Sequence, residues 1–259
     1  MPSTQAADYS VILWDNLVAI DNVTATTEAS GFPASNLANP NTSQAWRATD
    51  TATVYVTVVV DAPIDSLAIA KHNLGSIGAT VSLEIQNTFA SGWTELVAGQ
   101  VLPNDAPKLF TMGVVAPLYA VRLKIVTPSS PPQIAVMSVG AKLIMERGIW
   151  VGHTPITYAT RVNAIDGIAE SGDFLGSIVL GEFRESAANF QHLDPAFVRA
   201  SLWPFLKAAT TQRLPFFFQW RPATYPLEVG YVRLTNNPDA TPSEPSHLYE
   251  IELAMRGVA

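Results

Sequence analysis

Among the residues able to do chemistry, Glu250 and Glu252 come closest to a catalytic pair. They are two residues apart in a segment that alternates apolar and polar side chains, so on a strand they would share one face, roughly 6–7 Å apart. Glycosidases place two carboxylates about 5–10 Å apart. Adjacent glutamates on a strand more often face water and only make the surface soluble. A second acidic group, Asp166, Glu170 and Asp173, lies among turn residues and is typical of a solvated loop.

The sequence shows no pattern of histidines or cysteines that is typical of a catalytic or metal site. The chain has no cysteine, which excludes disulfides, thiolate ligands and cysteine nucleophiles. No phosphate-binding loop, dinucleotide fingerprint or nucleophile elbow is present. The histidines are far apart and lack the spacing of zinc ligands, although distant histidines can meet in a fold; they are His72, His153, His192 and His247. We therefore expect a protein that is not an enzyme and has no cofactor.

Composition limits the partners that the protein can have. Only 14% of the 259 residues are charged, and the net charge is -7, which argues against a nucleic-acid surface. No apolar run approaches the roughly 18 residues of a membrane span, and residues Met1 to Ala7 show no signal-peptide pattern. A chain of this length fits one large domain or two modest ones, with a core that needs no covalent staples.

The first part of the chain is rich in strand patterns separated by turn residues. β-branched runs and alternating apolar and polar residues predict half-buried strands, here at Tyr9–Trp14, Val54–Asp61, Ser66–Ala70, Val81–Gln86, Leu118–Val126 and Gln133–Leu143. Many short strands of this kind indicate an antiparallel sandwich. We place the domain boundary near Arg147, which gives a first domain of residues 1–147 and a second of residues 148–259.

The second domain is centred on the segment Leu214–Pro222. Alternation places Phe216 and Phe218 on one face of a strand and Phe217 on the other, so both faces should be covered. Further strands are expected at Tyr158–Ile165, Gly176–Arg184, Val229–Leu234 and Tyr249–Met255.

One helix is expected in this domain. It should begin at the N-cap Asp194 and be interrupted near Trp203 by Pro204, which cannot donate a backbone hydrogen bond. The prediction is a mainly β protein, with a sandwich followed by a smaller β-sandwich or barrel that carries one helix.

Landmarks in the first domain resemble, in their order, a discoidin or galactose-binding-like jelly roll over roughly residues 8–145. They are Phe32-Pro-Ala-Ser-Asn-Leu, Ala45-Trp-Arg, Val54–Asp61, His72-Asn-Leu, Ala120–Ile125 and Ile134–Gly140. The resemblance implies that loops at one end could bind sugars or lipid head groups, but this fold serves many functions. It carries over no ligand residue. Trp46 could stack on a sugar, or it could be a core residue; we favour the core. His72 is a candidate donor to a ligand hydroxyl or caps a turn, and we favour the turn.

The same resemblance raises the question of a structural calcium ion, which some members of this family hold near the first loop. Asn39, Asn41 and Asp50 could supply oxygen ligands. The low charge count argues against tight calcium binding.

A second resemblance lies in the C-terminal part. Phe216-Phe-Phe-Gln-Trp-Arg-Pro, then Tyr225-Pro, then Val229-Gly-Tyr resemble the C-terminal domain of minor tail proteins of long-tailed bacteriophages. This implies a structural virion protein of the tail tip or baseplate, of the distal tail type. Copies would form a ring, with tube, hub and fibre proteins as neighbours and a host-surface glycan as a further partner. The alternatives are a carbohydrate-binding module and a decoration or adhesin domain.

Candidate interface residues follow from apolar bulk next to turns, the type of side chain that anchors protein contacts. They are Trp150, Trp203, Tyr225 and Tyr231, and each could equally be a core residue. Arg221, which directly follows the central strand, is a candidate ion-pair partner across an interface.

Overall fold

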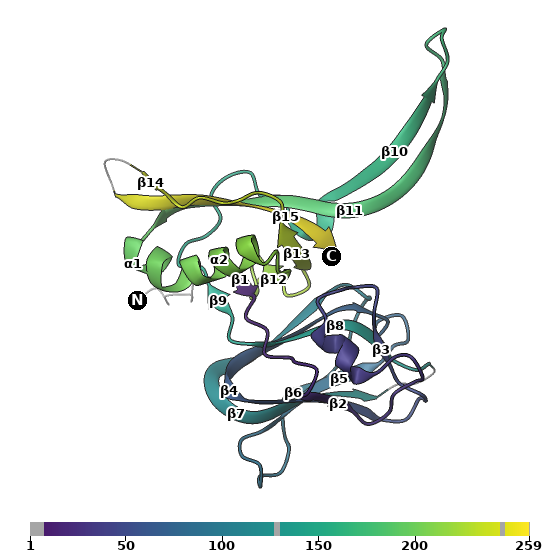
Figure 1. The fold of residues 1–259 in the computed structure, drawn as a ribbon, viewed down its shortest axis with the longest axis vertical. Helices are drawn as coiled ribbons and strands as arrows, with labels where there is room; N and C mark the ends of the chain where they lie inside the picture. The colour runs from purple at the N-terminus through teal and green to yellow at the C-terminus, as the bar shows by residue number, and fades with distance from the viewer. Residues whose placement is uncertain (1–7, 127–129, 244–246, 259) are drawn as a thin grey trace.

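The computed structural model describes residues 8–126, 130–243 and 247–258 and confirms the expected class (Figure 1). The chain is mainly β, with two antiparallel sheets and one helical segment. Each sheet belongs to a unit with its own core, and we call these the sandwich unit and the sheet-and-helix unit. Among the described residues, no helix has the length and apolarity needed to cross a membrane.

The sandwich unit is built on a seven-stranded sheet in the order β3-β8-β4-β7-β5-β6, with β2 paired to β4. A short 3₁₀ helix, Ala34–Ala38, lies over it. The strands are β2 (Val23–Ala25), β3 (Trp46–Arg47), β4 (Val54–His72), β5 (Thr80–Gln86), β6 (Thr94–Val101), β7 (Lys108–Val126) and β8 (Gln133–Gly140).

Two long strands turn this sheet into a sandwich. β4 and β7 pair along most of their length, with register shifts around 59–62 and 64–66. Asp61 has a φ of 42° at this bend. The first half of β4 pairs with β2, and its second half pairs with β8. The sheet therefore curls over and encloses an apolar core, as the curved ribbons of β4 and β7 show (Figure 1). The strands expected at Val54–Asp61 and Ser66–Ala70 are thus one bent strand.

The sheet-and-helix unit contains one open eight-stranded sheet in the order β10-β11-β15-β13-β12-β1-β9, with β14 paired to β15. The sequence predicts a sandwich or barrel with one packed helix. The packed helix is present, but the strands form one open sheet, whose body is covered by the helix on one face and by the sandwich unit on the other. The strands are β1 (Val11–Leu13), β9 (Leu143–Ile144), β10 (Thr160–Ile168), β11 (Phe174–Leu193), β12 (Phe216–Gln219), β13 (Val229–Leu234), β14 (Thr241–Ser243) and β15 (Leu248–Val258).

The first strand of the chain belongs to this second sheet. Ile12 of β1 lies opposite Phe218 of β12 on one side and Leu143 of β9 on the other. The sandwich unit is therefore inserted between β1 and β9, whereas the sequence suggested two consecutive domains. All three residues of β1 are buried there: Ile12 packs in the core under the helix, and Val11 and Leu13 pack on the other face of the sheet.

The helical segment has the expected beginning and the expected interruption. The Asp194 carboxylate accepts a hydrogen bond from the Ala196 N–H at 2.7 Å, as an N-cap should. A first turn, α1 (Pro195–Phe197), leads into a π-helical stretch (Val198–Leu202) and then α2 (Trp203–Thr211). The π-helical turn comes directly before Pro204, because proline cannot donate to the preceding turn.

β12 is covered on both faces, as its alternation predicts. Phe216 and Phe218 pack in the core under the helix. There the rings of Phe205 and Phe216 meet edge to face, with 4.9 Å between their centres. On the other face, Phe217 belongs to a second core shared with the sandwich unit, which we call the junction core. Its members are Val11, Leu13, Ala45, Ala68, Ala70, Leu109, Ala135, Val136, Phe217, Val229 and Tyr231. The two units therefore meet through a buried apolar contact.

Candidate functional site

A two-stranded ribbon projects from the sheet-and-helix unit (Figure 1). It comprises residues 160–184, where β10 and β11 pair with each other. The remaining part of β11, from Arg184 to Leu193, pairs with β15 in the body of the sheet. A short 3₁₀ helix, η2 (Ile156–Tyr158), leads into the ribbon. Among the described residues the ribbon is thus a β-hairpin without a third strand.

The ribbon exposes an unusual number of large apolar side chains. Eight of them are 53% to 70% exposed: Val162, Ile165, Ile168, Phe174, Leu175, Ile178, Val179 and Leu180. Ile165 lies opposite Ile178, and the next pair along the ribbon is Ala164 with Val179. Since neighbouring pairs point to opposite faces, the ribbon is apolar on both. Single exposed apolar residues are normal, but a contiguous apolar patch marks an interaction site.

The charged residues of the ribbon are distributed unevenly. Its distal part carries Asp166, Glu170 and Asp173 and no lysine or arginine. The Ser171 hydroxyl donates to the Asp173 carboxylate at 2.7 Å, and all three acidic residues are exposed, as expected for a solvated turn. At the root of the ribbon, the Arg256 guanidinium of β15 lies 3.5 Å from the centre of the Phe183 ring. The ribbon is therefore anchored at its root and apolar and acidic at its end.

The interface candidates from the sequence occupy different environments. Trp150, Trp203 and Tyr225 are 54%, 56% and 41% exposed, so their side chains are open to a partner. Arg221 is also exposed, with its guanidinium 5.2 Å from the Trp220 ring. Tyr231 is a core residue, the alternative stated for each candidate: it is buried in the junction core, where its hydroxyl donates to the Pro40 carbonyl at 2.8 Å. Tyr231 thus joins the two units within the chain.

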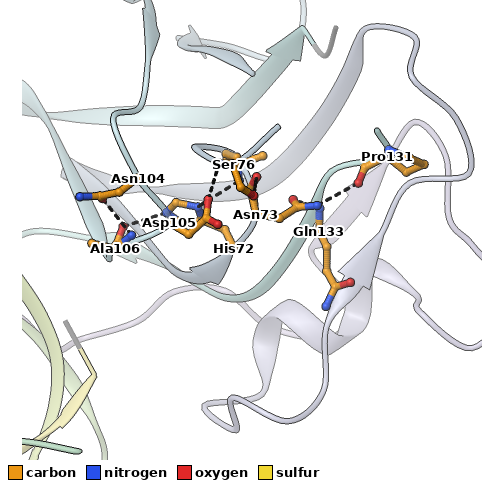
Figure 2. Close-up of polar contacts among 9 residues, drawn as sticks. His72, Asn73, Ser76, Asn104, Asp105, Ala106, Pro131 and Gln133 are labelled. Carbon is orange, nitrogen blue, oxygen red and sulfur yellow. Dashed lines mark hydrogen bonds and ion pairs between the residues drawn. The ribbon is translucent and has the colours of Figure 1, made fainter. Parts of the chain in front are cut away.

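Both glycan candidates are buried. The Trp46 ring lies in the core of the sandwich unit, and its Nε1–H donates to the Thr27 carbonyl at 3.0 Å. His72 Nε2 lies 2.9 Å from the Ala106 carbonyl (Figure 2). His72 Nδ1 accepts a hydrogen bond from the Leu74 N–H. Nε2 must then carry the proton, which makes this a neutral histidine that caps a turn. The Trp46 ring is fully buried and cannot stack on a sugar, and His72 is 6% exposed.

A polar pocket of about 380 Å³ lies beside His72, and we call it the His72 pocket. Much of its wall is already hydrogen-bonded: Asp105 accepts from the Ser76 N–H, and Asn73 bridges the Gln133 N–H and the Pro131 carbonyl (Figure 2). Its lining residues are Thr42, Ser43, Ala45, Lys71, His72, Asn73, Asp105, Gln133 and Ala135. A sugar there would find polar partners but no aromatic platform.

The candidate calcium ligands and the glutamate pair have ordinary structural surroundings. Asn39, Asn41 and Asp50 each accept a hydrogen bond from a backbone N–H two residues further along the chain, which is the Asx-turn pattern. Within the described ranges, no group of three or more acidic or histidine side chains could hold a metal ion. Glu250 and Glu252 are exposed on β15, as alternation predicts.

Two histidines, the buried His72 and the half-buried His153, should make stability depend on pH. Burial lowers the pKa of His72 and of His153 below the usual 6.5, although hydrogen bonds to Ala106 and Ala187 oppose this. At pH values between the pKa of the folded histidine and that of the unfolded one, the unfolded chain binds more protons. The free energy of unfolding is therefore not reduced by these histidines above pH 6.5, and it falls as the pH drops below that value. We expect the free energy of unfolding, measured with urea, to decline below that pH and to decline less in His72→Gln. His192→Gln, at an exposed site, should keep the wild-type slope; a slope unchanged in His72→Gln would contradict this reasoning.

No protein-family model and no curated protein sequence matches this chain. Solved structures of similar fold include chitosan-binding module 1 of a chitosanase/glucanase from Paenibacillus sp. IK-5. It is 13% identical, covers 48% of this chain and 97% of its own, and has a TM-score of 0.42.

A family 32 carbohydrate-binding module from C. perfringens NanJ, solved with galactose, is 17% identical, covers 52% of this chain and 99% of its own, and has a TM-score of 0.41. A pectin-binding carbohydrate-binding module is 19% identical, covers 48% of this chain and 89% of its own, and has a TM-score of 0.39. These likenesses concern the fold of about half the chain and assign no ligand and no residue role.

Proposed function

We propose that this protein is a structural subunit that assembles with copies of itself through the ribbon and does no catalysis. The observation that carries the proposal is the exposure of eight large apolar side chains on both faces of residues 160–184. A lone two-stranded hairpin is marginally stable in water, and natural proteins protect such edges. A ribbon of this composition is therefore suited to burial against a partner.

The energetics favour a partner that covers most of the ribbon. Complete burial of one large apolar side chain contributes about 1.5–3 kcal/mol, while association costs about 4–15 kcal/mol in lost freedom of motion. Burial of one or two of these side chains cannot offset the cost of association. Burial of both faces of the ribbon against a neighbouring subunit can offset it.

A projecting arm also suits a ring. When an arm of one copy contacts a different surface of the next copy, the contact is heterologous, and a rotation that closes generates a ring. The exposed side chains of Trp150, Trp203, Tyr225 and Arg221 belong to the same unit as the ribbon and are proposed as further contacts. The sandwich unit would then be carried on the outside of the ring.

The more specific proposal is a subunit of the tail tip or baseplate of a bacteriophage. It rests on the sequence resemblance of residues 216–231 alone, and the three solved structures described above are carbohydrate-binding modules. On this proposal the protein is located in the virion tail and contacts tube, hub and fibre proteins.

Light scattering after size exclusion, across a range of protein concentrations, tests the assembly proposal. A discrete trimer or hexamer supports it, because closed rings come from cyclic contacts. A monomer at every concentration contradicts it.

A second candidate function is carbohydrate binding by the sandwich unit. The observation that favours it is the His72 pocket, which has polar side chains and is open to solvent. We expect Lys71→Ala, a change at an exposed lining residue, to weaken any binding of galactose measured by calorimetry. The control is Lys207→Ala, an exposed lysine on α2. No heat with galactose, or equal heat from wild type and Lys71→Ala, would remove this pocket as the site.

A further inference from the structure

A separate pocket of about 330 Å³ lies where the two units and the helix meet, and we call it the junction pocket. Segments far apart in the sequence form its walls, among them the chain that follows β1, residues 38–40, strand β8, the end of α2 and residues 214–217. Phe217 and Tyr231 of the junction core also line it. Its volume is at the lower end of the range for small-molecule sites, which often lie at junctions of this kind.

The walls of the junction pocket are held by hydrogen bonds from both units. The Asn16 amide donates to the Met137 carbonyl at 3.1 Å and accepts from the Val139 N–H at 3.0 Å. Tyr231 fixes the Pro40 carbonyl from the other unit. The side chains of Asn16 and Tyr231 therefore have structural partners, and the pocket is formed before any ligand binds.

Three other polar side chains of the junction pocket have no such partners. Within the described part of the chain, no hydrogen bond or ion pair involves the side chain of Asp15, Ser138 or Gln212, although all three line the pocket. Ser138 is only 5% exposed. Asp15 and Gln212 are exposed at the rim of the pocket. A hydroxyl, an amide and a carboxylate are thus available to a ligand in exchange for water.

The charge of the lining selects the kind of ligand. Asp15 is its one charged residue; lysine, arginine and histidine are absent from the lining. Ala208 and Gln212 bring the C-terminal turn of α2 to the same wall, and a helix C-terminus carries a partial negative charge. An anion would be repelled, whereas a cation would be attracted. The Trp14 ring in the lining adds a surface over which a cation is favourable.

We propose that the junction pocket binds a small organic cation, a protonated amine on a ligand about the size of one sugar ring. The Asp15 carboxylate holds the amine, and Ser138 and Gln212 bond the polar groups of the ligand. Trp14 and Phe217 provide apolar contact. This site does not depend on the assembly role proposed above.

Glucosamine and glucose form a matched pair of probes because they differ in one amine. In protein-observed NMR titrations of the full chain, at a pH where the amine is protonated, we expect glucosamine to shift resonances around the pocket and glucose to shift them far less. Asp15→Asn should weaken glucosamine binding roughly tenfold, the effect of losing one hydrogen bond to a charged group. The melting temperature of Asp15→Asn should match that of wild type.

Asp21→Asn is the control, since it removes an equal charge from an exposed site outside the pocket lining. It should bind glucosamine as wild type does. Equal shifts with glucose and glucosamine, unchanged binding in Asp15→Asn, or no shift with glucosamine would each overturn the proposal.

Discussion

Replacing Ile165 and Ile178 with serine is expected to abolish the self-association that we propose for the ribbon, while leaving the melting temperature of the protein nearly unchanged. These side chains face each other across the ribbon and are 58% and 67% exposed. In a single copy these two side chains belong to no core, so their replacement should change the free energy of unfolding only a little. At the centre of an interface, truncating each isoleucine would weaken the binding free energy by about 2 kcal/mol or more, which is roughly thirtyfold in affinity per residue. Sedimentation velocity would report the change in association, and calorimetry the unchanged melting.

The matched control is Ile20→Ser, at an isoleucine that is 74% exposed in the sandwich unit. It removes a similar exposed side chain from a place outside the ribbon and should leave assembly intact. If the ribbon variant associates as wild type does, or if Ile20→Ser weakens association equally, the ribbon is not the assembly surface.

Replacing Phe217 with alanine should have the largest effect on folding. The side chain is 1% exposed in the junction core, and its ring lies 4.9 Å from that of Tyr231. Truncating a buried phenylalanine to alanine costs about 3–5 kcal/mol of unfolding free energy. Because Phe217 packs in the core shared by the two units, we also expect the unfolding transition of the variant to be broader than that of wild type, or to split into two. Urea denaturation, followed by fluorescence and by circular dichroism, would show both effects.

Phe217→Leu provides the comparison, because it keeps an apolar side chain and should cost far less. Phe216→Ala, on the helix side of the same strand, should destabilise without separating the units. A loss below about 1 kcal/mol in Phe217→Ala would show that the junction core is not well packed.

Local patterns in the sequence were sufficient to predict the strand and helix around which the second unit is built. Alternation in residues 214–222 indicated a strand covered on both faces, and Phe216 and Phe217 do lie in different cores. The cap at Asp194 and the interruption before Pro204 follow from backbone hydrogen bonding alone. Such features are decided within a few residues, so a single sequence contains them.

Features that depend on distant partners could not be predicted in this way. β1 reads as an ordinary apolar strand, and nothing near it indicates that its neighbours are Phe218 and Leu143. Exposure is equally hidden: the residues of β11 have the same composition as a buried strand, although those of the ribbon face solvent. Trp46 could be read as platform or core because a tryptophan serves both, and only its surroundings decide. The junction pocket was missed because no motif joins Asp15 to Gln212.

Hydrogen exchange of the amides of residues 160–184 would show whether the ribbon is buried in an assembly. At the lowest protein concentration, these amides should exchange rapidly, since the ribbon has no third strand and no cover among the described residues. At the highest concentration, we expect strong protection confined to the ribbon and to the surface that receives it. Rapid exchange of the ribbon at every concentration would contradict the claim that these residues are buried in an assembly.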